Sequence, residues 1–100
     1  SMLDSKMLDM LRCPVDGGRL FPVSHEDLQR INLAILSGEL RDRLDQRIND
    51  GLDAGLLNRQ SLRIYPVRGG IPSLVANEAI ELPQGFFAWT ENKDGRVGDS

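Results

Sequence analysis

Cysteine and histidine are nearly absent from this sequence of 100 residues, which contains only Cys13 and His25. A single thiol excludes an intrachain disulfide, so a reducing compartment fits and we expect a cytoplasmic protein. Structural zinc usually takes four ligands, mostly cysteine and histidine. The set that could be gathered here, Cys13 and Asp16 with His25 or Asn58, is poor in sulfur, and we expect no metal or other cofactor.

Long apolar runs and an excess of positive charge are missing as well. No segment reaches the roughly 18 consecutive apolar residues of a membrane span, and we expect no signal peptide and no membrane contact. Lysine and arginine number 12 against 15 aspartate and glutamate, which gives a formal net charge of −3. Because nucleic-acid-binding domains usually carry a basic face, we expect contact with nucleic acid only through a partner.

Recognisable catalytic motifs are also lacking. A nucleophilic cysteine needs a neighbouring base, and nothing in the sequence places His25 beside Cys13. The pair Gly69-Gly70 precedes Ile-Pro rather than a helix, which argues against a phosphate-binding loop. Paired acidic residues lie among arginines, as is typical of a solvated face. We therefore expect a protein that is not an enzyme.

The stretch that is most clearly patterned is residues 62–75, LRIYPVRGGIPSLV, which predicts two short strands joined by a tight turn. Its first half is rich in strand-forming residues, and Gly69-Gly70 permits the positive φ angles of a tight reversal. Pro66 and Pro72 lack a backbone donor, which favours an edge strand. An edge strand can pair with a strand of another chain, so the hairpin is also a candidate partner surface.

Two helices are predicted before this hairpin. Apolar residues at helical spacing between Leu3 and Leu11 predict the first, which should end at Cys13-Pro14 because proline cannot continue a helix. The second is predicted over residues 24–37, with Ser24 as its N-cap and Gly38 as its stop. Residues 39–50 are expected to be mainly loop with some helix.

Shorter elements complete the prediction. Residues 19–23 read as a strand, residues 56–57 as a strand paired with 62–67, and residues 77–80 as a helical turn. Residues 83–100 are predicted to be a flexible tail, in which the apolar residues 86–89 should dock on a protein surface. The predicted fold class is α+β: one domain over residues 2–82 with a small antiparallel sheet of three to four strands, an N-terminal helix and a helical insertion at about 24–50.

Two segments carry a family resemblance: residues 8–20, LDMLRCPVDGGRL, and residues 62–79, which contain YPVRGGIP. Together they resemble the small zinc-ribbon-like activator subunit shared by tRNA, rRNA and release-factor methyltransferases, and its short bacterial YcaR-like relatives. In that family a helix runs into a Cys-Pro-x-Cys knuckle, and a late hairpin reads roughly Tyr-Pro-Ile-x-x-Gly-Ile-Pro. The resemblance is split around residues 21–53.

The resemblance implies a zinc-ribbon-like fold whose metal site has degenerated. The second knuckle cysteine of the family corresponds to Asp16 here, and a further cysteine on the hairpin corresponds to Asn58. Cys13, Asp16 and Asn58 would then be vestigial metal positions. The knuckle itself could be retained through the geometry of Gly17-Gly18 and hydrogen bonding by Asp16.

The resemblance also implies a function: a non-catalytic subunit that binds the catalytic subunit of an S-adenosylmethionine-dependent methyltransferase. Strand pairing and burial of apolar surface would stabilise or activate that partner. The residues expected to supply the contacts lie on the hairpin, and about half of them should face the core instead: Ile64, Val67, Ile71, Pro72, Leu74 and Val75. The alternatives are a small nucleic-acid-binding ribbon module and a self-associating structural protein that forms a homodimer.

Overall fold

The computed structural model describes residues 5–89, which form two α-helices, a short 3₁₀ helix and six strands. In chain order the elements are α1 (Ser5–Met10), β1 (Phe21–Pro22), α2 (His25–Leu36), β2 (Arg41–Asp42), β3 (Ala54–Asn58), β4 (Arg63–Arg68), β5 (Ile71–Pro72), the 3₁₀ helix η1 (Ala76–Glu78) and β6 (Ile80–Glu81). The strands make one antiparallel sheet in the order β1-β3-β4-β6-β2, and β5 pairs with β4 off that path. The α+β class is confirmed, but the sheet has six strands rather than three to four.

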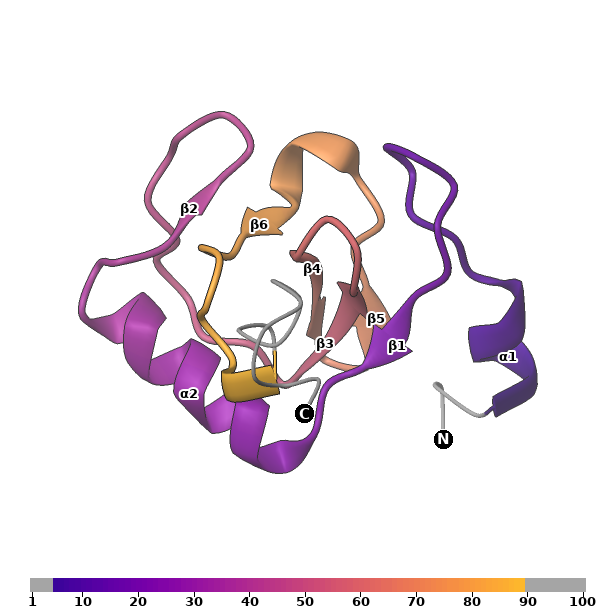
Figure 1. Cartoon of the computed structure of the whole chain (residues 1–100), viewed down its shortest axis with the longest axis horizontal. Coiled ribbons are helices and arrows are strands. Elements are labelled where there is room, and N and C mark those ends of the chain that lie inside the picture. The colour runs from indigo at the N-terminus through magenta and orange to yellow at the C-terminus, as the bar shows by residue number, and fades with distance from the viewer. Residues whose placement is uncertain (1–4, 90–100) are drawn as a thin grey trace.

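The sheet separates two apolar clusters. Leu57 and Ile64 join Ile31 of α2 in the larger cluster, whereas Leu56 and Tyr65 join Cys13 in the smaller one. Successive strand residues point to opposite faces, so adjacent residues of β3 and β4 serve different clusters. Figure 1 shows α2 and α1 on opposite sides of the sheet. We call these two faces the α2-side face and the α1-side face.

Helix α2 begins and ends as predicted. The Ser24 hydroxyl accepts a hydrogen bond from the Asp27 backbone N–H at 3.1 Å, which satisfies one of the unpaired donors at the helix start. At the other end Gly38 adopts a φ of 78°, a conformation that glycine takes without steric penalty. The apolar face between these ends places Ile31, Ala34 and Ile35 in the core.

The predicted tight hairpin is present between β4 and β5. Gly69 and Gly70 have φ angles of 62° and 79°, as a two-residue turn with both central residues at positive φ requires. The prediction that this hairpin holds an edge strand is wrong for β4, which pairs with β3 on one side and with β5 and β6 on the other. Pro66 fits there because its carbonyl accepts a hydrogen bond from the Ser73 N–H on the β5 side. The nitrogen of a strand residue points to the same side as its carbonyl, so the missing donor of Pro66 faces the gap between β5 and β6.

Three further predictions need correction. Helix α1 already ends at Met10, before Cys13-Pro14. Residues 39–50 contain the short strand β2 and no helix. The flexible tail is wrong for residues 84–89, because Phe87 is 1% exposed and packs in the α2-side core; this confirms the expected docking of the segment. Residues 90–100 lie outside the described part of the chain.

Candidate functional site

The knuckle predicted at Cys13 is a closed loop. Arg12 and Arg19 form a backbone bridge across its base. Inside it the Cys13 N–H donates to the Gly18 carbonyl, and the Gly17 N–H donates to the Cys13 carbonyl, both at 2.8 Å. Gly17 adopts a φ of 76°, which the tight reversal requires. The loop therefore holds its shape through its own backbone.

The structure brings together Cys13, Asp16 and Asn58, the three positions that the resemblance predicts to be vestigial metal ligands. Nδ2 of Asn58 donates to both carboxylate oxygens of Asp16, at 2.9 and 3.1 Å, and links the knuckle to the end of β3. Oδ1 of Asn58 accepts from the backbone N–H groups of Gln60 and Ser61. The Cys13 sulfur lies 2.9 Å from the Tyr65 hydroxyl oxygen. Asn58 is only 2% exposed and Asp16 is exposed, so the network runs from the protein surface to a buried amide.

The network shifts three pKa values. Burial acts to raise the pKa of Cys13, but hydrogen bonds from Tyr65, Asn58 and the knuckle backbone outweigh it, and the pKa lies below the ordinary 9.0. The hydrogen bond from the Gly18 N–H is the main reason that the pKa of Asp16 lies below 3.8. Burial, followed by the hydrogen bond with Cys13, raises the pKa of Tyr65. Tyr65 therefore stays protonated and can donate to the sulfur.

These residues do not fit a structural zinc ion. Both polar ends of the Asn58 amide are occupied, one by Asp16 and the other by backbone N–H groups. The thiol of Cys13 and the carboxylate of Asp16 remain as donors, whereas a structural zinc takes four. Within residues 5–89 no group of three or more histidine, cysteine or acidic residues is arranged to hold a metal.

Cys13 and His25 do not form a nucleophile–base pair. Cys13 is buried in the cluster on the α1-side face. His25 opens α2 across the sheet, is exposed, and has its Nε2 atom 3.3 Å from Nε2 of Gln29. The only described histidine is therefore unable to activate the thiol.

The six predicted partner residues do not form one surface. Ile64 and Val67 are 0% and 1% exposed, so they cannot contact a partner and belong to the half of the set that was expected to face the core. Pro72 lies opposite Val67 in the ladder and shares the α1-side face with it, whereas Ile71 lies opposite Arg68 on the other face. Leu74 is half-buried against the α1-side cluster, and Val75 is 51% exposed.

The free edge of β5 offers little to an incoming strand. The Ser73 N–H bonds to the Pro66 carbonyl, and backbone groups alternate in direction along a strand, so those of the adjacent Pro72 point away from β4. Proline has no N–H, so this outward position offers no donor to a new strand. The same pattern holds for β1: Val23 N–H bonds to Gly55, so Pro22 faces outward. Such prolines are a known way of blocking edge-to-edge pairing.

The described residues 5–89 cover the α1-side face only thinly. Helix α1 is six residues long and none of its residues is buried. Five half-buried apolar side chains pack against the buried cluster there: Leu8, Leu11, Val15, Ala54 and Leu74. They come from α1 and the residue that follows it, the knuckle, β3 and the segment after β5, and their partial exposure was not evident from sequence periodicity.

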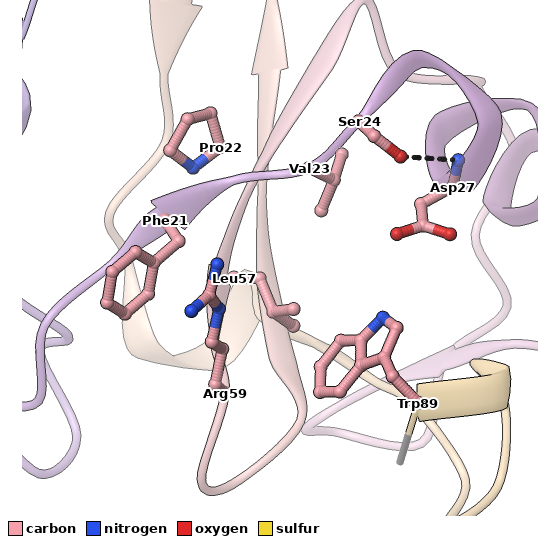
Figure 2. Close-up of a pocket in the computed structure, with 8 residues that line it drawn as sticks. All are labelled: Phe21, Pro22, Val23, Ser24, Asp27, Leu57, Arg59 and Trp89. Carbon is pink, nitrogen blue, oxygen red and sulfur yellow. Dashed lines mark hydrogen bonds between the residues drawn. The ribbon is translucent and has the colours of Figure 1, made fainter.

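A second surface was missed by the sequence reading. A pocket of about 390 Å³ lies between β1, the start of α2, the end of β3 and Trp89, and its lining residues are drawn in Figure 2. Phe21 and Trp89 supply aromatic surface, and Arg59 and Asp27 supply opposite charges. The available signal was the aromatic segment 86–89, whose docking position could not be derived from its composition.

The fold defines the chain as a small α+β domain built on one six-stranded antiparallel sheet. It is similar to the solution NMR structure of XF2673 from Xylella fastidiosa, with 28% sequence identity and a TM-score of 0.61 over 79% of this chain and 81% of that one. No family model and no curated protein matches the sequence. Among residues 5–89 no helix has the length and apolar character needed to cross a membrane.

Proposed function

We propose that this chain is a non-catalytic protein-binding subunit that stabilises or activates an S-adenosylmethionine-dependent methyltransferase. The observation that carries the proposal is the thin cover of the α1-side face, where half-buried Leu11, Val15 and Leu74 surround a buried apolar cluster. Removing apolar surface from water contributes about 25 cal/mol per Å², so covering these side chains would drive association.

The class of partner rests on the resemblance of residues 8–20 and 62–79 to the methyltransferase-activator subunits. In this proposal the knuckle is a zinc-ribbon-like element whose metal site has degenerated, and the Asp16–Asn58 hydrogen bonds hold it in place of a metal. These hydrogen bonds hold the knuckle against the end of β3, which supports the proposal. The knuckle then places Val15 on the proposed partner surface.

Strand pairing plays a smaller part in the proposal than apolar burial. On the free edge of β5 the Pro72 carbonyl can accept one hydrogen bond, but its nitrogen cannot donate. A partner strand would therefore gain little of the regular ladder that supports β-augmentation. The contact is expected to centre on Leu74 and the knuckle rather than on Ile71.

Affinity purification from the source cell tests the proposal, with the full chain as bait. The wild-type chain is expected to recover a methyltransferase, and Leu74→Asp to lose it because the charge would be desolvated at the interface. Ile71→Asp is the matched control: Ile71 is 65% exposed on the other face, so capture should persist. Thermal unfolding of each bait verifies that it is folded.

Three results would contradict the proposal. One is recovery of no methyltransferase by the folded wild-type chain. Another is loss of capture by Ile71→Asp with retention by Leu74→Asp, which would instead indicate pairing at the β5 edge. The third is a concentration-dependent dimer in sedimentation that Leu74→Asp abolishes, because the same face would then be occupied by a second copy.

A further inference from the structure

We propose that the pocket between β1, the start of α2 and Trp89 binds a nucleotide, taken either free or from a single strand. The pocket lies on a different part of the molecule from the α1-side face, because Leu57 at its floor belongs to the α2-side core. The inference is therefore independent of the methyltransferase proposal. Three features of the pocket, each suited to one part of a nucleotide, carry it.

The first feature is a stacking platform. The Trp89 indole lies on the Phe87 ring with centroids 5.1 Å apart and an angle of 10° between the ring planes. Phe87 is fixed in the core, so it sets the orientation of the indole. Such a stack covers one face of the indole, and Trp89, which is 37% exposed as a whole residue, also lines the pocket. Exposed aromatic faces of this kind stack nucleobases irrespective of sequence.

The second feature is a guanidinium held in a fixed position. Arg59 follows β3 and places its guanidinium carbon 3.9 Å from the centroid of the Phe21 ring. Phe21 is in turn positioned by pairing with Leu57. Arginine forms bidentate hydrogen bonds with phosphate and also stacks on bases, so Arg59 can serve either the phosphate or the ring of a nucleotide.

The third feature is a carboxylate at the rim of the pocket. Asp27 lies in the first turn of α2, and Figure 2 shows its carboxylate on the pocket side. Its backbone N–H bonds to Ser24, but its carboxylate makes no hydrogen bond or ion pair with the described residues 5–89. A carboxylate accepts hydrogen bonds from the N–H groups of a base edge. Guanine offers two adjacent donors there and uracil one, so Asp27 should favour guanine.

The charge arrangement favours a nucleotide over a cationic side chain of a partner protein. Arg59 lies over the Phe21 ring and lines the pocket, whereas Arg19 lies over the same ring outside the pocket lining and is paired with Asp9. A second cation placed there would be repelled, whereas a phosphate would be attracted. The volume of about 390 Å³ suits a single nucleotide, and the net charge of −3 argues against a long nucleic-acid track.

Fluorescence of Trp89 tests the inference in the full chain, because this is the only tryptophan in the sequence. Excitation at the red edge of tryptophan absorption avoids absorption by the nucleotides. Millimolar GMP is expected to change the emission saturably, with UMP about tenfold weaker, as expected for the loss of one good base contact. A short guanine-containing oligonucleotide that binds no more tightly than GMP would identify the free nucleotide as the ligand, and one that binds more tightly would identify the single strand.

Two variants assign the polar contacts, and a third is the control. Arg59→Ala should weaken GMP binding about tenfold through loss of the charge-assisted hydrogen bonds. Asp27→Asn should bring GMP and UMP to similar affinity. Arg43→Ala removes the same charge from the distant loop after β2 and should bind GMP like the wild type. The inference is overturned by an unchanged emission and indole N–H NMR signal, by an equal response to inorganic phosphate alone, or by saturable binding of arginine amide in place of GMP.

Discussion

At the scale of single residues, Asp16 shows how one carboxylate organises the knuckle through hydrogen bonds. Its carboxylate accepts from the Gly18 N–H at 2.8 Å and from the Asn58 amide. These bonds favour the charged form, so the folded protein lowers the pKa of Asp16 below 3.8. A group of this kind stabilises the fold only while it is ionised.

The acid dependence of stability follows from that shift. Above pH 3.8 the contribution of Asp16 is complete, and it is lost as the pH falls through the lower pKa of the folded state, because the unfolded chain takes up the proton first. Asp16→Asn should therefore show a shallower loss of stability with acid than the wild type, in urea unfolding followed by circular dichroism. Asp50→Asn, at an exposed position, is the control. The prediction would be refuted if the stability of Asp16→Asn fell with acid as steeply as that of the wild type.

At the scale of elements, Asn58 joins the knuckle to the β3–β4 hairpin beside the contact between Cys13 and Tyr65. Asn58 ends β3, donates to Asp16 in the knuckle and accepts from two backbone N–H groups of the turn that leads to β4. The same turn places Leu62 at a φ of 60°, and the Leu62 N–H bonds back to the Asn58 carbonyl. One amide thus fixes both the turn and the loop packed against it.

Removal of this amide should destabilise the fold measurably. Asn58→Ala leaves the turn N–H groups without a buried acceptor, and we expect a loss of about 1–3 kcal/mol in the free energy of unfolding. Urea unfolding measures it, with Asn77→Ala as the control because Asn77 is exposed and should change by less than about 0.5 kcal/mol. Equal stability of the two variants would mean that the Asn58 network contributes nothing.

At the scale of the whole molecule, the α2-side core is closed by residues far apart in sequence. Ile31 and Ile35 of α2, Ile64 of β4 and Phe87 near the end of the described chain share one cluster. The backbone carbonyl of Phe86 also accepts from the Arg30 side chain at 2.8 Å, which ties the last segment to α2. The domain therefore extends beyond residue 82, where the sequence placed its end.

Phe87 should accordingly be essential for stability. Phe87→Ala would leave a cavity in the larger core, and we expect a loss of about 3–5 kcal/mol, a large fraction of the stability of a domain of this size. Leu36→Ala is the control, because Leu36 is 79% exposed and its removal creates no cavity. Thermal and urea unfolding compare the two, and a Phe87→Ala variant as stable as the wild type would show that the segment is not part of the core.

The sequence by itself determined the elements whose signals are local. Ser24 and Gly38 set the two ends of α2, because capping and positive φ depend on a few neighbouring residues. Gly69-Gly70 set the reversal between β4 and β5 for the same reason. The grouping of Cys13, Asp16 and Asn58 was also anticipated, but through the family resemblance.

Only the tertiary structure decided the features that depend on partners distant in sequence. The two-residue strands β2 and β6 exist because each finds a neighbour in the sheet, and no alternation in their own residues announces them. Ile64 and Ile71 are equally apolar in sequence, yet pairing buries one and leaves the other in solvent. Strand register likewise decides whether Pro72 blocks an edge, and packing decides which residues Trp89 faces. Local propensity specifies neither of them.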